Sequence, residues 1–407
     1  MKNAILVLAL LTAAAFSRSI IPPIPDSVAD SSLTAGNGRF AVELFREISR
    51  ESQGDNIFFS PFSISMAMGM TWNGATGETA RQMASVLNFD MPVYFVNRSF
   101  ERITERISSG TAGEMGGEPL TMTVSNGIWV QNGFQLLNSF TEAVTGCYGA
   151  SAENLDFTGD PEGSREEINE WVAENTMQKI IDLLAPGTIT PDTRLVLTNA
   201  VYFKASWLYP FEELATAEGG FTRGDGEKVT VPMMNQTEFF DYASSDEWQA
   251  VRMPYAGGSS SMLIILPRNM ESYLEGFDEE AIPDVERRLS RVNVALSMPR
   301  FEFSQSITLG DILISMGMEL PFSGEADFTP ITGNPDLFIS QVLHKAYVKV
   351  NEEGTEAAAA TAVVMNITSA PGSVEQMIVN RPFLFLIKND ETGSILFMGL
   401  VYDPSVS

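Results

Sequence analysis

The stretch from residue 352 to residue 373 constrains the fold most, because its composition differs from that of the strands predicted on either side. It reads EEGTEAAAATAVVMNITSAPGS and directly follows a strand expected over 338–350. Four consecutive alanines favour a helix, but Gly354 precedes them and the β-branched Val363 and Val364 follow. Long segments without regular structure are uncommon in compact domains and are usually functional. The sequence therefore predicts a long exposed loop with a function.

Considered as a strand, the same segment has two different faces. One face is small and uncharged, and it would consist of Thr355, Ala357, Ala359, Thr361, Val363 and Met365. The other face begins with Glu356, which carries the only charge between residues 355 and 366. Such a strand can enter a sheet above a hydrophobic core without burying a charge. A flexible, alanine-rich surface loop explains this composition equally well, so the segment alone leaves both interpretations open.

The residue counts exclude several classes of fold and function. The 407 residues include one cysteine and one histidine, so neither an intramolecular disulfide nor a His/Cys zinc cluster can form. A Ser-His-Asp or Cys-His catalytic centre would have to use His344. The 25 Lys+Arg and 52 Asp+Glu give a net charge of −27, which argues against nucleic acid, anionic membranes and heparin-like polymers as partners. No phosphate-binding or dinucleotide-binding motif is present, and nothing indicates a cofactor.

The first residues have the pattern of a secretory signal. Lys2 precedes an apolar run over 4–11, and small residues follow over 12–15. The run is shorter than the roughly 20 residues that a membrane-spanning helix needs. We therefore expect a signal peptide over 1–15, cut after Ala15 or Ser17, and a secreted protein that is extracellular or periplasmic. Closely spaced prolines after residue 21 predict an extended, proline-rich leader over 16–36.

Hydrophobic periodicity places helices mainly in the first half of the chain and strands mainly in the second, which is typical of the α+β class. No linker interrupts the chain after residue 37. Helices are expected over 37–53, 60–70, 78–87, 96–107, 140–148, 165–184 and 309–316. Strands are expected over 121–131, 194–203, 229–233, 239–242, 248–254, 261–267, 292–303, 338–350, 381–389 and 394–402.

Several separate motifs resemble the serpin family of serine protease inhibitors. They occur in the family's order from about residue 37 to the C-terminus, and this order makes the resemblance more specific than any one motif. Besides the loop start at 352–362, they are NIFFSPFSIS (56–65), GATGETARQM (74–83), INEWV (168–172) with Thr176, Lys179 and Ile180, TNAVYFKASW (198–207), MGM (316–318) with ADF (326–328), HKA (344–346), NRPFLF (380–385) and FMG (397–399). Gln178 departs from the pattern, because the family often has glycine at this position.

The resemblance implies a single α+β domain over 37–407 with three β-sheets, about nine helices and an exposed reactive-centre loop over about 352–380. It also implies the family's activity, which is inhibition of serine endopeptidases and not an enzymatic reaction. The protease attacks the loop and forms an acyl-enzyme, and insertion of the loop hinge into the main sheet of this metastable fold then traps it. The hinge would consist of Glu352, Glu353, Gly354, Thr355, Glu356, Ala357, Ala358, Ala359, Ala360 and Thr361.

The same resemblance assigns structural roles to residues far from the loop. Trp207 would be the breach tryptophan at the top of the main sheet, and Cys147 is expected to be a buried free thiol. His344 would then be a structural histidine rather than a catalytic one. It would belong to the shutter, a hydrogen-bonded cluster beneath the point where the sheet opens, together with Ser60, Ser63 and Asn199.

The position of the scissile bond depends on which end of the loop is used for counting. Counting from Glu352 gives Thr368, whereas counting back from residues 382–383 gives a site nearer Pro371, so the candidates are Thr368, Ser369 and Ala370. The loop contains no Lys or Arg between Thr355 and Asn380, and trypsin-like proteases need such a cation. We therefore expect elastase-like or subtilisin-like targets and a monomeric inhibitor.

A non-inhibitory serpin that acts as a binding or chaperone module is the alternative. A charged residue at position 355 or a proline within 357–361 would block insertion and favour this alternative. Neither occurs in the sequence.

Overall fold

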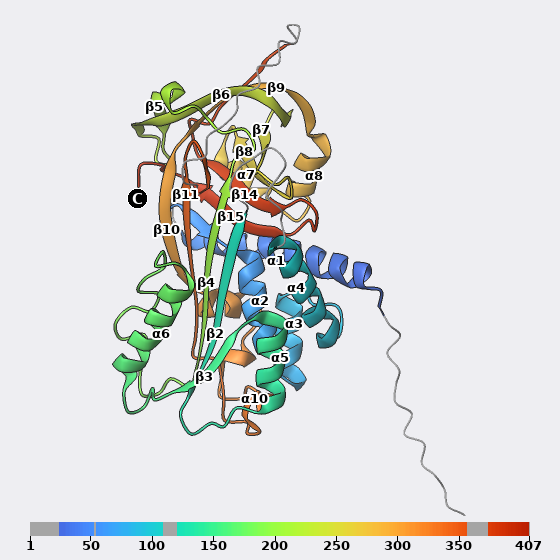
Figure 1. Ribbon diagram of the computed structural model, residues 1–407, viewed down its shortest axis with the longest axis vertical. Helices are drawn as coiled ribbons and strands as arrows, with labels where there is room; N and C mark the ends of the chain where they lie inside the picture. The colour runs from blue at the N-terminus through green and yellow to red at the C-terminus, as the bar shows by residue number, and fades with distance from the viewer. Residues whose placement is uncertain (1–23, 53, 109–119, 356–372, 407) are drawn as a thin grey trace, which may run out of the picture.

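The structure is a computed structural model that describes residues 24–52, 54–108, 120–355 and 373–406. A six-stranded sheet runs along the length of the elongated molecule, and a nine-stranded sheet lies at its upper end (Figure 1). The mixture of helices and strands confirms the α+β class. The expected signal peptide over 1–15, the first part of the leader and residues 356–372 lie outside the described residues.

Ten α-helices occur in the described part of the chain. The central one, α2 (Pro61–Trp72), begins at Pro61, and the Ser60 hydroxyl accepts a hydrogen bond from the backbone N–H of Ser63. Its residues are buried on nearly every side. Among the described helices, none combines the length and the apolar character that a membrane span requires. The others are α1 (Asp26–Glu51), α3 (Gly77–Val86), α4 (Val93–Ser108), α5 (Asn138–Tyr148), α6 (Pro161–Asn175), α7 (Met270–Glu275), α8 (Ala281–Arg288), α9 (Gly310–Ser315) and α10 (Thr329–Thr332).

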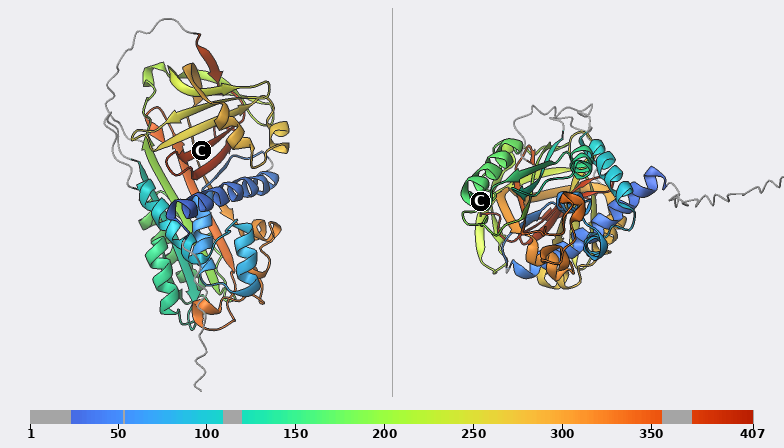
Figure 2. Two further views of the ribbon diagram at one scale, coloured as in Figure 1. Left: turned by 90° about the vertical axis from the view of Figure 1, so that its right-hand side faces the viewer. Right: turned by 90° about the horizontal axis from the view of Figure 1, so that it is seen from below.

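The six-stranded sheet positions the loop. Its strand order is β10-β11-β12-β4-β2-β3, and the very short β12 separates two long strands at one end only. Helix α6 covers one face, where Ile168 and Val172 pack on Val196 and Ala200, and α1, α2, α4 and α5 lie on the other face (Figures 1 and 2). The strands are β2 (Thr121–Gln131), β3 (Ser151–Leu155), β4 (Leu195–Ser206), β10 (Phe301–Thr308), β11 (Gln341–Val350) and β12 (Gly354–Thr355).

The nine-stranded sheet bends at β6, which is long enough to serve two groups of strands. One part of β6 pairs with β5 and β9, and its last residues pair with β7. Hydrogen bonding therefore joins the second and third of the expected sheets into one. The strands are β1 (Ile57–Phe59), β5 (Ala217–Thr222), β6 (Lys228–Ser244), β7 (Trp248–Pro254), β8 (Ser260–Pro267), β9 (Ser290–Pro299), β13 (Glu375–Ile378), β14 (Phe383–Asn389) and β15 (Ile395–Val401).

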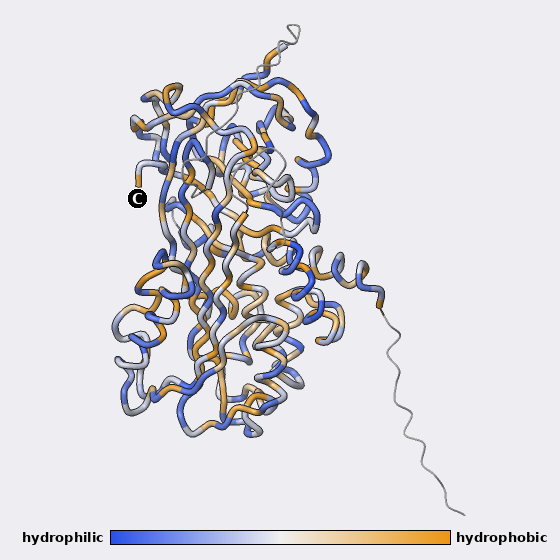
Figure 3. Tube along the Cα trace, in the orientation of Figure 1, coloured by the Kyte–Doolittle hydropathy of each residue, from blue (hydrophilic) through white to orange (hydrophobic). Residues whose placement is uncertain are grey.

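The expectation of an extended leader over 16–36 is wrong from residue 26 onward, because α1 begins at Asp26. Pro25 is the last of the clustered prolines, and Ala29 and Leu33 continue the buried stripe that leads to Phe40. Figure 3 shows α1 alternating between hydrophilic and hydrophobic residues along its length, as expected for a helix with one buried face. The clustered prolines therefore set the residue at which α1 begins, but the chain directly after them is helical.

Three other element boundaries differ from expectation. Helix α6 ends at Asn175 instead of residue 184, because Met177 and Gln178 have φ angles of 53° and 60°. This left-handed conformation favours glycine, which gives a physical reason for the family's preference at position 178. The strand expected over 292–303 divides at Arg300 into β9 and β10, which belong to different sheets. The two strands expected over 229–233 and 239–242 are one continuous strand, β6.

Candidate functional site

The start of the loop forms a tight hairpin at the upper end of the six-stranded sheet. The carboxamide oxygen of Asn351 accepts hydrogen bonds from the backbone N–H groups of Glu353 and Gly354, at 3.1 and 3.2 Å. The Asn351 N–H donates to the Gly354 carbonyl at 3.0 Å. This turn reverses the chain, so that Thr355 pairs antiparallel with Val350.

The hairpin places β12 between β4 and β11, which pair directly with each other only lower down. Residues Gln341–Ala346 of β11 pair in parallel with Val196–Val201 of β4. Above these residues β4 pairs with β12 instead, through Ser206 with Gly354 and Ala205 with Thr355. We call this opening the sheet mouth, and define it as residues 202–206 of β4 and 347–350 of β11. The sheet is thus joined below and opened above, with Gly354 and Thr355 of the expected hinge already inside.

Thr355 is fixed in the sheet mouth by an aromatic pair. Its side chain is 1% exposed, and its hydroxyl is hydrogen-bonded to the hydroxyl of Tyr255 at 2.7 Å. The Tyr255 ring stacks on Trp207 with a centroid distance of 4.6 Å and an interplanar angle of 7°. Thr355 therefore points into the core, as expected for the uncharged face of the segment.

Gly354 lies too close to β4 to carry a side chain. A Cβ atom at this position would lie 2.1 Å from the carbonyl oxygen of Ala205. Such a contact is far inside van der Waals distance, so the backbone would have to move. Glycine is therefore required for this close approach of β12 to β4.

Trp207 holds the hairpin through its backbone and its side chain. Its indole N–H donates to the Asn351 carbonyl at 3.0 Å, and its backbone N–H donates to the Glu353 carbonyl at 2.8 Å. The N–H of Phe211 donates to the Glu352 carbonyl at 2.9 Å. The indole is 3% exposed. The expected breach tryptophan thus lies at the upper end of the sheet and contacts the base of the loop directly.

Glu352 is a buried carboxylate with two partners. Arg300 approaches one carboxylate oxygen at 2.5 Å, and the hydroxyl of Thr216 donates to the same oxygen. Burial alone would raise the pKa of Glu352, but the hydrogen bonds from Arg300 and Thr216 outweigh it and hold the pKa below its ordinary value. The first residue of the expected hinge is therefore an anchored anion.

Ser60, Ser63, Asn199 and His344 form one hydrogen-bonded cluster beneath the sheet. Asn199 donates to the Ser63 hydroxyl at 2.5 Å and to Asn126 at 2.6 Å, and Ser60 donates to the Leu396 carbonyl at 2.6 Å. Asn199 and His344 are also directly paired across β4 and β11. The cluster therefore lies just below the sheet mouth, where the two strands are still joined.

The hydrogen bonds of His344 define its tautomer. Its Nε2 accepts from the backbone N–H of Ser60 at 3.1 Å, so this nitrogen carries no proton. Its Nδ1 must then donate to the carboxamide oxygen of Asn199, at 2.5 Å. Burial lowers the pKa of His344 to about 3, so the ring is neutral at physiological pH. Both ring nitrogens are thus occupied by hydrogen bonds to other groups of the protein, an arrangement that suits a structural histidine.

Sequence reasoning missed the partners that the fold supplies from distant segments: Asn126, Thr216, Tyr255, Arg300 and Asn351. Asn351 could have been found, because an asparagine three residues before a glycine is a common turn signal. The others have no local signature. Arg300, for example, lies in what the sequence presents as one continuous strand. Of the hinge, the described residues include Glu352 to Thr355, whereas Glu356 to Thr361 and the scissile candidates Thr368, Ser369 and Ala370 lie outside them.

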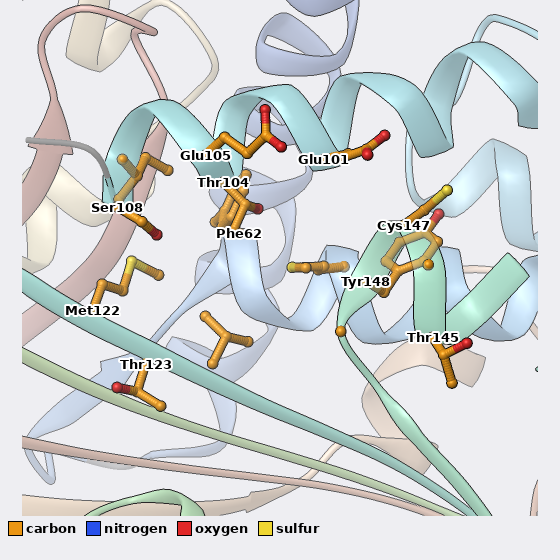
Figure 4. Close-up of a pocket in the computed structure, with 15 residues that line it drawn as sticks. Phe62, Glu101, Thr104, Glu105, Ser108, Met122, Thr123, Thr145, Cys147 and Tyr148 are labelled. Carbon is orange, nitrogen blue, oxygen red and sulfur yellow. The ribbon is translucent and has the colours of Figure 1, made fainter. Parts of the chain in front are cut away.

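A separate hollow of about 390 Å³ lies between α2, α4, α5 and β2, away from the hinge. Figure 4 shows Met122, Cys147 and Tyr148 around it. Cys147 is a free thiol, as expected, but it is only partly buried. The expectation of a buried side chain is therefore wrong. Burial nevertheless raises its pKa, which keeps the thiol protonated and less reactive at neutral pH.

Comparison with known proteins identifies the family. The family model for Serpin (serine protease inhibitor) matches residues 35–404. Leukocyte elastase inhibitor A of Rattus norvegicus is 36% identical over 384 residues, which cover 91% of this chain and 99% of that protein. An uncharacterized serpin-like protein of Methanosarcina mazei is 34% identical and covers 93% of this chain and 89% of its own length. The crystal structure of human thyroxine-binding globulin complexed with thyroxine superposes with a TM-score of 0.83 at 28% identity, covering 94% of this chain and all of that chain. The chain therefore has the serpin fold and belongs to the serpin family.

Proposed function

We propose that this protein is a secreted, suicide-type inhibitor of serine endopeptidases with elastase-like or subtilisin-like specificity. The target's serine hydroxyl attacks the carbonyl carbon of the scissile residue, which is Thr368, Ser369 or Ala370. The peptide C–N bond breaks, the leaving amine takes a proton, and an ester joins the protease to the loop. The loop then inserts between β4 and β11 before water hydrolyses the ester.

The observation that carries the proposal is the partly inserted β12. Its register with both neighbours extrapolates without a bulge into the joined part of the sheet. Continuing it would place Ala357 between Val348 and Phe203, and Ala359 between Ala346 and Val201. From Ala359 onward each step replaces a parallel pairing of β4 with β11 by two antiparallel pairings, so a central strand is added to the sheet.

The same register brings Thr361 between His344 and Asn199. Insertion to this depth would separate the two residues of the buried cluster, whose hydrogen bonds must then find new partners. The Thr361 hydroxyl can donate and accept, which suits it to this exchange. Because every member of the cluster is uncharged, the exchange leaves no buried charge unpaired.

Charge also favours the first step of insertion. In the continued register Glu356 would lie between Lys204 and Lys349, on the outer face of the sheet. Both lysines are partly exposed, and Lys349 forms an ion pair with Glu302 at 2.9 Å. The only charged residue in the inserting segment would therefore meet two cations rather than the core.

The targets are proposed from the loop sequence. The uncharged small residues at 368–370 fit shallow or apolar primary pockets, whereas trypsin-like proteases require a cation. Rattus norvegicus leukocyte elastase inhibitor A, a relative over nearly the whole chain, points to the same class of protease.

The decisive experiment is incubation of the purified protein with pancreatic elastase and, separately, with subtilisin. The proposal expects a covalent complex that survives boiling in SDS. Mass spectrometry of the released C-terminal fragment should locate the cut within 365–371, and a cut elsewhere would remove the assignment of the scissile bond. Clean cleavage by both proteases without any complex would contradict inhibition and favour the non-inhibitory alternative.

Export is a separate part of the proposal, and it depends on residues 1–15 alone. Expression of the full chain in a secreting host should yield mature protein that begins at residue 16 or 18. N-terminal sequencing of protein from the medium or periplasm tests this. Full-length protein retained inside the cells would contradict it.

A further inference from the structure

The hollow between α2, α4, α5 and β2 has an apolar interior. Its volume of about 390 Å³ lies within the roughly 300–1,000 Å³ of small-molecule sites. Phe62 and Met66 of α2 and Tyr148 of α5 are buried, and Met122 and Val124 of β2 complete the apolar lining. Methionine and aromatic side chains together suit an apolar ring or chain. Because these residues belong to regular elements that pack on one another, the interior is already formed.

The hollow is negatively charged along α4. Glu101 and Glu105 lie one turn apart on this helix and both line the hollow, as Figure 4 shows. Glu101 forms an ion pair with Arg98, which is not part of the lining, whereas Glu105 forms no ion pair with any described residue. Among the described residues that line the hollow there is no lysine or arginine. Like charges four residues apart on a helix repel each other, and a bound cation would relieve this repulsion.

Thr104 adds a third oxygen to the same side of the hollow. It lies three residues after Glu101 and directly before Glu105, and residues at this spacing share one face of a helix. Its hydroxyl oxygen is buried and has no hydrogen-bond partner among the described residues. A threonine in a helix can donate to a carbonyl of the preceding turn, so a buried hydroxyl without this bond is available to a ligand. Two carboxylates and this hydroxyl give three acceptors, which matches the three N–H donors of a primary ammonium group.

We propose that the hollow binds a small primary amine with an apolar body. The protonated amine would donate to Glu105, Thr104 and Glu101, and the apolar body would pack on Phe62 and Met66. A carboxylate or phosphate would meet two like charges instead. A metal ion is not favoured, because within the described residues no three His, Cys, Asp or Glu side chains come close enough together to hold one. The hollow lies away from the hinge, so this inference does not rest on the proposed function.

The first test compares three compounds that share one body and differ in charge. They are 4-phenylbutylamine, 4-phenyl-1-butanol and 4-phenylbutyrate, titrated into the full chain by isothermal titration calorimetry at pH 7, where the amine is protonated. We expect the amine to bind roughly tenfold more tightly than the alcohol, since hydrogen bonds to charged groups are the stronger ones. The carboxylate should bind more weakly than the alcohol. Equal affinities for the amine and the alcohol, or no binding of the amine, would overturn the proposal.

The second test uses variants of the charged side. Glu105→Gln should weaken binding of the amine by roughly fivefold, because it removes the carboxylate that has no other cation. Glu101→Gln should have a smaller effect, since Arg98 already pairs with Glu101. Glu170→Gln is the matched control, because Glu170 is an exposed glutamate of α6 and its loss changes the net charge equally. An affinity that is the same in Glu105→Gln as in the wild type would contradict the assignment of the ammonium site.

The third test locates the bound amine without any substitution near the hollow. In protein labelled with ¹³C at the methionine methyl groups, the amine should shift the signals of Met66 and Met122, which line the hollow. The signal of Met298, which is buried in β9, should stay in place. Shifts of other methionines without these two would place the amine elsewhere and overturn the proposal.

Discussion

Strands β4 and β11 are held together by different means at their two ends. In the lower part they pair directly, above a fully buried cluster of neutral side chains centred on Asn199 and His344. In the sheet mouth they are separated by β12, and anchors from other segments fix the hairpin. One of those anchors, the pair of Glu352 with Arg300, is ionic and reaches the surface.

The difference matches what each end would have to do during insertion. The upper end has already admitted two residues, so its contacts must hold the base of the loop in one register. The lower end must still open, and neutral hydrogen bonds can exchange partners without stranding a charge in the core. Along the same two strands, the upper end thus fixes the register of the loop, and the lower end is the part that can open.

The largest expected effect follows from placing a charge in the sheet mouth, at the position of Thr355. Thr355→Arg would put a cation where the native side chain is 1% exposed, and no acid lies next to it among its described partners, Tyr255, Val350 and Ala205. Insertion should then fail, and the protein should become a substrate that is cleaved with almost no SDS-stable complex. Gel analysis of the reaction with the trapped protease checks this, with Thr355→Ser, which keeps the hydroxyl, as the matched control. Complex formation at the wild-type level by the arginine variant would contradict the account.

The second effect concerns the pH dependence of stability that arises from His344 in the buried cluster below the sheet mouth. His344 stays neutral in the fold down to about pH 3, whereas in the unfolded chain it takes up a proton near its ordinary value of 6.5. The unfolded state therefore binds more protons between these values, so this residue removes stability as the pH falls through this window. The slope is at most about 1.4 kcal/mol per pH unit.

Denaturant unfolding of the wild type and of His344→Gln between pH 7 and pH 4 isolates this contribution. Acidic residues contribute to the pH dependence of both proteins, so the difference between the two curves reports His344. We expect the free energy of unfolding to fall less steeply in the variant. Parallel curves would show that the pKa of His344 is the same in the folded and the unfolded state.

The third effect tests the close approach in the sheet mouth. Gly354→Ala places a Cβ atom against the Ala205 carbonyl, and relief of this overlap should displace β12 at a cost of roughly 1–3 kcal/mol. Hydrogen exchange of the amides in residues 202–207 should increase. Gly220→Ala is the matched control, because nothing lies within 4 Å of the added atom there. Unchanged exchange in the Gly354 variant would mean that β12 does not depend on this contact.

The smallest effect concerns the charge of the first inserting residue. Lys204→Gln and Lys349→Gln each remove one of the cations that would flank Glu356, and partly exposed pairs of this kind contribute about 0.5 kcal/mol. The yield of complex relative to cleaved inhibitor should fall by roughly twofold. Lys345→Gln is the control, because the register pairs this residue with the uncharged Ala360. Equal yields from all three variants would argue against the continued register.

The sequence predicted the side to which Thr355 points because this depends on a local feature. Alternation of Thr355 with Glu356 fixes which side is charged, and Thr355 does lie against the core. The α+β class followed from hydrophobic periodicity in the same way. The expected helix start at residue 37 is wrong, because the clustered prolines prevent a helix only up to Pro25 and α1 begins at Asp26.

The contacts that hold the hinge could not be predicted, since they join segments that are far apart in the chain. Arg300 reaches Glu352 only because β9 and β10 enter different sheets at this residue. Tyr255 reaches Thr355 because it directly follows β7 and forms a bridge with Trp207 at the end of β4. Side-chain partners of this kind are set by tertiary packing, which leaves no periodic signal in the sequence.

The central claim is that cleavage lets the loop continue β12 into the sheet, and thermal unfolding before and after a single cut in the loop tests it most directly. The protein should be cut within 365–371, freed of protease and compared with intact protein. Because a new central strand would fill the sheet mouth and pair on both sides, we predict a markedly higher melting temperature for the cleaved form, and no such rise for Thr355→Arg. A cleaved form that melts at or below the temperature of the intact protein would contradict the account.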